Sequence, residues 1–189
     1  MSNSPISRFD VPALEDLPDD IREEILAVQE KTGFVPNVFL ALARRPEEFR
    51  ALFAFHAALM DSDVGLSKAE RELIVVATSA LNHCLYCVVA HGAILRIRAK
   101  DPMIADQVTV NPAKADLTDR QRAIVDFAIR VAEDSATITD ADLDAMRAEG
   151  FSTDEIWDIG AITALFALSN RYANFAGITP NQEFYAMAR

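Results

Sequence analysis

Cysteine is scarce in this 189-residue chain, which has two such residues, too few for a fold held by several disulfides. The chain also lacks a basic N-terminal segment followed by an apolar run, so we expect no secretory signal. Its longest strongly apolar stretch, residues 159–168, is about half as long as a membrane-spanning helix requires. These absences predict a cytoplasmic protein with no membrane partner.

Basic residues are also few, with 18 Lys and Arg against 29 Asp and Glu, for a net charge of -11. Such a chain repels a phosphate backbone, so we expect no nucleic-acid partner. Period-two alternation bounded by turn residues is missing throughout, and this excludes a β-sheet from the expected fold. What the chain does have is 51% hydrophobic composition, enough to form the core of one domain.

The spacing of apolar residues predicts an all-α fold, with a single helical domain over residues 18–189. An extended arm is expected over residues 1–17, where Pro5 and Pro12 occur without a periodic apolar pattern. Ser67 and Glu70 form a capping box that opens a central helix ending near Leu81. A second helix holds both cysteines and ends near residue 99, and further helices are expected over residues 19–31, 38–43, 46–60, 118–132, 139–150 and 153–177, with a short one after 180.

The two cysteines form a Cys-x-x-Cys pair, Cys84 and Cys87, with His91 four residues further on. On a helix the three side chains share one face, since they lie within about 60° of one another. Asn82 is a suitable N-cap, which would put both cysteines in the first turn and a half of the helix. Unpaired backbone N–H groups there stabilise a thiolate, and a neighbouring imidazolium does so too. The pattern therefore predicts activated sulfur.

His91 is one helical turn beyond Cys87, so the spacing favours Cys87 as the nucleophile. If the substrate is a peroxide, the Cys87 thiolate attacks one oxygen and becomes a sulfenic acid, which then condenses with Cys84. The product is a Cys84–Cys87 disulfide. An external thiol or dithiol, such as a lipoylated or thioredoxin-like protein, is needed to reduce it.

Glu72 is the carboxylate best suited to assist His91, but its position sets a condition. It lies twelve residues before Cys84, a rise of about 18 Å along one straight helix. The assignment requires the helix to break near Asn82-His83, so that the cysteine-bearing segment folds back. One unbroken helix over residues 68–99 would remove Glu72 from the site.

With Glu72, Cys84, Cys87 and His91 in this spacing, the chain resembles the carboxymuconolactone decarboxylase superfamily, in its alkylhydroperoxidase AhpD-like branch. The likeness covers most of the chain, including Gly33-Phe34-Val35-Pro36-Asn37, Leu66-Ser67 and Asn170-Arg171. The resemblance implies an AhpD-like all-helical homo-oligomer with antioxidant peroxide chemistry. It makes Cys87 the peroxidatic and Cys84 the resolving cysteine, with a proton relay from Glu72 through His91, and it implies no cofactor. Tyr86 stands where the best-known members have a histidine.

Other interpretations of the same residues remain open at this point. The cysteines could be buried small hydrophobes, or could bind zinc together with His91 and Glu72, although structural zinc sites rarely use a carboxylate. The alternative function is thus a non-catalytic metal-binding or redox-sensing helical oligomer. His83 is expected to be solvated, and His56 to be a hydrogen-bonded helix residue rather than a catalyst. Tyr86 is expected to point away from the cysteine face.

Overall fold

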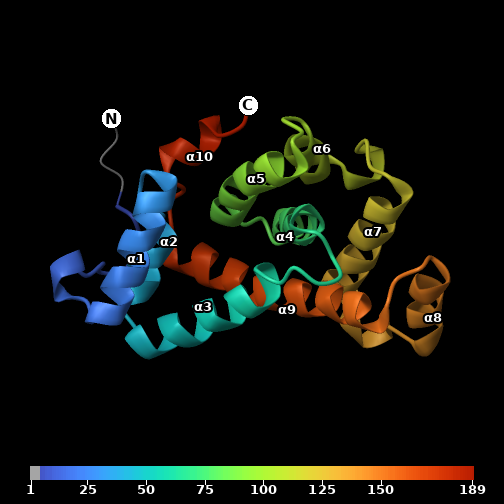
Figure 1. The fold of residues 1–189 in the computed structure, drawn as a ribbon, viewed down its shortest axis with the longest axis horizontal. Coiled ribbons are helices and arrows are strands. Elements are labelled where there is room, and N and C mark those ends of the chain that lie inside the picture. Colours follow the sequence, from blue (N-terminus) through green and yellow to red (C-terminus); the bar gives the residue numbers. More distant parts are fainter. Residues whose placement is uncertain (1–4) are drawn as a thin grey trace.

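Over residues 5–189, which are the residues described, the computed structural model consists of α-helices joined by short turns, with no strand (Figure 1). The predicted all-α fold is confirmed. The helices are α1 (Asp19–Thr32), α2 (Asn37–Ala43), α3 (Pro46–Met60), α4 (Lys68–Leu81), α5 (Leu85–Ala99), α6 (Ile104–Val110), α7 (Asp119–Asp134), α8 (Asp140–Ala148), α9 (Thr153–Ala176) and α10 (Gln182–Ala186). Short 3₁₀ turns cover Leu14–Asp16, Pro112–Lys114 and Ser135–Thr137.

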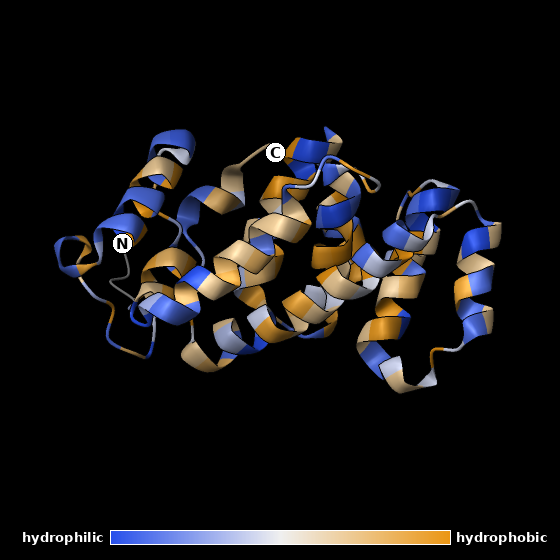
Figure 2. Ribbon diagram, turned by 60° about the horizontal axis from the view of Figure 1, so that its bottom comes forward, coloured by the Kyte–Doolittle hydropathy of each residue, from blue (hydrophilic) through white to orange (hydrophobic). Residues whose placement is uncertain are grey.

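Helix α4 is the centre of the molecule. It begins at the predicted capping box, in which Ser67 accepts the Glu70 N–H and the Glu70 carboxylate accepts the Ser67 N–H. Every residue from Arg71 to Ser79 is buried. In Figure 1 α4 is seen end-on, with α5 and α6 on one side and α3 and α9 on the other. Hydrophobic residues are concentrated around this central part (Figure 2).

Arg71 anchors the entry to α4 from inside the core. Its guanidinium donates hydrogen bonds to the carbonyl oxygens of Leu59, Val64 and Leu66 and pairs with Asp158 of α9 at 2.9 Å. A buried cation needs such partners, because an unpaired one is strongly destabilising. The network fixes the α3–α4 connection and the rotation of α4, and thereby the position of Glu72, the next residue.

The segment before α1 lies against the end of α9. The Arg8 N–H donates to the Ala176 carbonyl, and the Thr179 N–H donates to the Ile6 carbonyl. Residues 5–13 have no helix. Residues 1–4 of the predicted arm lie outside the described residues, so the arm over 1–17 and its boundary stay a prediction. No helix in the described part of the chain is long and apolar enough to cross a bilayer.

Helix α9 has apolar residues on two sides. Its inner side is buried against α4 and α7, whereas Trp157, Leu168 and Phe175 are 74%, 47% and 55% exposed. These three residues fall within about 40° of one another around the helix axis. The outer side of α9 is therefore a continuous apolar stripe, and Phe55 of α3 adds another exposed aromatic ring.

Candidate active site

The chain breaks between α4 and α5, as the role of Glu72 requires. Helix α4 ends at Leu81, α5 begins at Leu85, and His83 in between has φ 51°, in the left-handed region. The prediction that Asn82 is the N-cap of α5 is wrong. The Asn82 N–H still bonds to the Thr78 carbonyl, so Asn82 is the C-cap of α4. The chain reverses at His83, and Cys84 becomes the N-cap of α5.

As the N-cap, Cys84 uses its sulfur to complete the first turn of α5. Its Sγ accepts the backbone N–H of Cys87 at 3.3 Å. The two Sγ atoms lie 2.7 Å apart, and both cysteines are free. Cys84 is 0% exposed and Cys87 2%. The pair is therefore buried, and the two sulfur atoms need to move only slightly to form a disulfide.

Cys84 is the cysteine of the pair that ionises first. A hydrogen bond from the Cys87 thiol lowers the pKa of Cys84, and the Cys87 N–H and the charge of His91 lower it further against the effect of burial. The neighbouring Cys84 sulfur and burial raise the pKa of Cys87. Cys84 is thus the more acidic cysteine of the pair, and when it ionises its thiolate can accept the Cys87 S–H.

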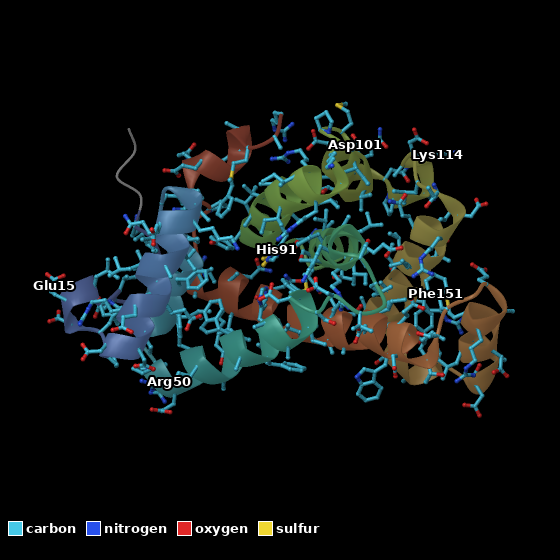
Figure 3. The ribbon with its side chains drawn as sticks, in the orientation of Figure 1. Glu15, Arg50, His91, Asp101, Lys114 and Phe151 are labelled. Carbon is cyan, nitrogen blue, oxygen red and sulfur yellow. The ribbon has the colours of Figure 1, made fainter. Side chains whose placement is uncertain are left out.

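His91 reaches the carboxylate that the sequence assigned to it. Because α5 folds back along α4, His91 Nδ1 lies 2.7 Å from Glu72 Oε2, and the side chains are 15% and 10% exposed. The Phe166 ring meets the imidazole edge-on, with centroids 4.8 Å apart. Figure 3 shows His91 in the interior of the molecule, between α5 and α9. The predicted helix break therefore brings Glu72 and His91 together.

Asn170 of α9 joins the site, a role that the sequence reasoning missed. Its Nδ2 donates to Ser79 Oγ at 2.9 Å, and its Oδ1 accepts a hydrogen bond from Asn82 Nδ2 at 2.9 Å. Hydrogen bonding by Asn170 also favours the charged form of both cysteines. The one signal in the sequence was an amide four residues after Phe166, on the apolar side of the helix, and nothing local links it to a cysteine more than 80 residues earlier.

His56 of α3 lies beside the Glu72–His91 pair. Its ring centroid is 6.3 Å from that of His91 and 6.1 Å from that of Phe166. Within residues 5–189 the side chain has no hydrogen-bond partner, unlike the hydrogen-bonded helix residue that we expected. Burial and the neighbouring His91 charge lower the pKa of His56 to about 4, so the ring is uncharged at neutral pH.

Tyr86 and His83 lie outside this cluster of polar groups. The Tyr86 hydroxyl accepts the Val38 N–H at 3.3 Å, and its ring packs edge-on against Phe184 of α10. Burial raises the pKa of the phenol, so it stays protonated. Tyr86 thus points away from the cysteines into packing, as expected. His83 is exposed.

Two further features bear on what the site can bind. In the described chain, residues 5–189, no group of three or more His, Cys, Asp or Glu side chains is arranged to hold a metal ion. A groove of about 700 Å³ lies between α3, α9 and the segment before α1, with Phe9, Phe55 and Leu168 among its lining residues. Neither cysteine lines it, nor do Glu72, His56 and His91. The groove is separate from the polar cluster.

Comparisons with known proteins agree with this architecture. A family model described as "Carboxymuconolactone decarboxylase family" matches residues 46–102. The chain is 62% identical to an uncharacterized peroxidase-related protein from Ralstonia eutropha, described as an alkylhydroperoxidase AhpD core, over 98% of each chain with a TM-score of 0.97. It is 38% identical to an uncharacterized peroxidase-related protein from Silicibacter, over 100% of this chain and 99% of that one, with a TM-score of 0.94.

A more distant solved structure shares the fold alone. The debrominase Bmp8 is 17% identical to this chain, over 98% of this chain and 97% of that one, with a TM-score of 0.78. No curated protein matches the chain.

Proposed function

Because the chain belongs to the AhpD-like branch of the carboxymuconolactone decarboxylase family, we propose that it is a thiol-dependent peroxidase of the alkylhydroperoxidase type. One observation carries the proposal: two free sulfurs lie 2.7 Å apart at the start of the helix that carries His91, whose imidazole is hydrogen-bonded to the Glu72 carboxylate. The sulfurs supply two electrons. The histidine can supply a proton to the oxygen that leaves.

In the proposed reaction the Cys87 sulfur attacks the peroxide. Its proton first shifts to the Cys84 thiolate across the short gap between the sulfurs. The Cys87 thiolate then forms an S–O bond while the O–O bond breaks, and His91, held by Glu72, gives a proton to the departing alkoxide. Cys84 displaces the oxygen of the Cys87 sulfenic acid as water. The overall change is one peroxide reduced to an alcohol and water, and one disulfide formed.

The order of the two cysteines is the part of the mechanism that needs a direct test. The family resemblance and the helical spacing favour attack by Cys87, whereas Cys84 is the more acidic of the two cysteines. The two are compatible because one proton transfer between adjacent sulfurs moves the charge. Cys87 as attacker and Cys84 as resolver therefore remain our assignment.

The regenerating reductant is proposed to be an external dithiol, such as a lipoyl group or a thioredoxin-like protein, in the cytoplasm. We also propose that the chain acts as a homo-oligomer. The apolar stripe on α9 supports this, because a contiguous patch of exposed apolar side chains marks a surface that binds a partner.

The test follows the consumption of tert-butyl hydroperoxide by the purified protein with dihydrolipoamide as reductant. We expect turnover by the wild type, none by Cys87→Ser, and a single event in Cys84→Ser that leaves a sulfenic acid on Cys87, which dimedone traps for mass spectrometry. His83→Asn is the control, since Asn tolerates the positive φ at that position. Equal rates in the wild type and Cys87→Ser would contradict the proposal. Trapping at Cys84 in Cys87→Ser, with no reaction in Cys84→Ser, would reverse the order.

A further inference from the structure

The accessible part of the site is its imidazole side and not its sulfur side. Cys84 and Cys87 are 0% and 2% exposed, whereas the Glu72 and His91 side chains retain some exposure. His56, from a separate helix, is also partly exposed. No lining residue of the apolar groove belongs to this cluster, so the histidine side is the part of the site that solvent contacts.

His56 is positioned to meet such a solute. Its ring and that of His91 both lie edge-on to Phe166, so His56 of α3 and His91 of α5 lie side by side against α9. Within the described residues neither ring nitrogen of His56 has a hydrogen-bond partner in the protein, and no fully buried side-chain nitrogen or oxygen there lacks one, so the His56 nitrogens are open to solvent. A polar side chain with free hydrogen-bonding capacity beside a reactive centre is suited to bind a ligand.

The neutral imidazole of His56 suits a ligand that is uncharged and can both donate and accept a hydrogen bond. Burial and His91 oppose a positive charge on the ring, and the more distant carboxylates of Glu72 and Asp61 only partly offset them. A neutral imidazole has one N–H donor and one acceptor nitrogen. A hydroperoxide has an O–H donor and oxygen acceptors. The two groups are complementary, whereas an anion would meet a single donor and no charge.

We propose that His56 is a binding residue for the hydroperoxide, which it holds by hydrogen bonds to the O–O–H group against His91. The inference rests on the proposed peroxidase function and adds a substrate contact to it. The centroid of the His56 ring lies 6.3 Å from that of His91, close enough for one O–O–H group to contact both rings, and His91 can then give a proton to the oxygen that leaves.

The test uses fully reduced protein and measures the rate of disulfide formation against hydroperoxide concentration, quenching with a thiol-alkylating reagent. His56→Phe keeps the ring packing but removes both nitrogens, and His56→Gln restores a donor and an acceptor. We expect the second-order rate constant to fall about tenfold in His56→Phe, the value of roughly one hydrogen bond, and to recover most of the loss in His56→Gln. His83→Asn should match the wild type.

A parallel measurement of iodoacetamide alkylation separates peroxide binding from thiol activation. We expect the wild type and both His56 variants to be alkylated at equal rates, because the thiolate is unchanged. An unchanged peroxide rate in His56→Phe, or equal losses of peroxide and iodoacetamide reactivity, would overturn the assignment of His56 alone. A wild type that alkylates normally but never forms the disulfide with hydroperoxide would overturn the proposed function and this inference together.

Discussion

At the scale of single residues, the charge of Glu72 matters more than its hydrogen bond. Glu72→Gln keeps an oxygen that can accept the His91 Nδ1–H but loses the carboxylate charge beside the imidazole. Charge-assisted hydrogen bonds are roughly twice as strong as neutral ones, so the variant should react with hydroperoxide about tenfold more slowly. The rate of disulfide formation in the reduced protein measures this. Glu23→Gln, an exposed change on α1, is the control.

His56 also affects stability. Its pKa falls from 6.5 in the unfolded chain to about 4 in the folded one, so between these values the unfolded chain binds more protons. The corresponding stability is fully present above pH 6.5 and is lost as the pH falls towards 4. The loss is about 3 kcal/mol for such a shift. Urea unfolding at pH 7 and pH 4 should show a smaller drop for His56→Phe than for the wild type. Equal drops would contradict this.

At the scale of elements, Asn170 and Asn174 connect α9 to the break between α4 and α5. Asn170→Ala leaves the buried Ser79 hydroxyl and the partly buried Asn82 amide without these partners and should cost about 2–3 kcal/mol in unfolding free energy. Asn174→Ala removes an exposed bond to the Asn82 carbonyl and should cost less than about 1 kcal/mol. Denaturant titration measures both. A similar cost for the two would show that the buried network does not hold the turn.

Local patterns were sufficient for the helices and for part of the site. The capping box at Ser67, the Pro46 start of α3 and the apolar spacing in α7 all depend on neighbouring residues, and each is found as predicted. The N-cap of α5 was not predictable in this way. Asn82 has the right chemistry, but its N–H is already used by α4, and only the left-handed His83 determines that Cys84 takes the position.

His56 and Asn170 could not be placed from the sequence for another reason. Both reach the site through helix packing, from α3 and α9, and their contacts join residues far apart in the chain. Periodicity identifies the buried side of a helix but not the element that it meets. Glu72 lay between these cases, because a single condition, the helix break, decided its position.

At the scale of the whole molecule, the stripe on α9 predicts self-association. Trp157, Leu168 and Phe175 expose apolar surface along one side of the longest helix. Analytical ultracentrifugation should give a mass above the 20.8 kDa of one chain, and Trp157→Lys should shift it towards that value. Val64→Lys alters an equally exposed apolar residue in the α3–α4 turn and should leave the mass unchanged. A wild type that sediments as a monomer would refute the oligomer.

Because a cysteine sulfur caps α5, the first turn of this helix is sensitive to the oxidation state of the cysteine pair. In the reduced protein the Cys84 sulfur accepts the backbone N–H of Cys87. Once that sulfur is in a disulfide it can no longer carry a negative charge and is a poorer acceptor, so the first turn of α5 loses most of its cap. The Cys87 amide should therefore exchange with deuterium faster in the oxidised than in the reduced protein. The exchange rate of this one backbone amide would report whether the cysteine pair is reduced or oxidised.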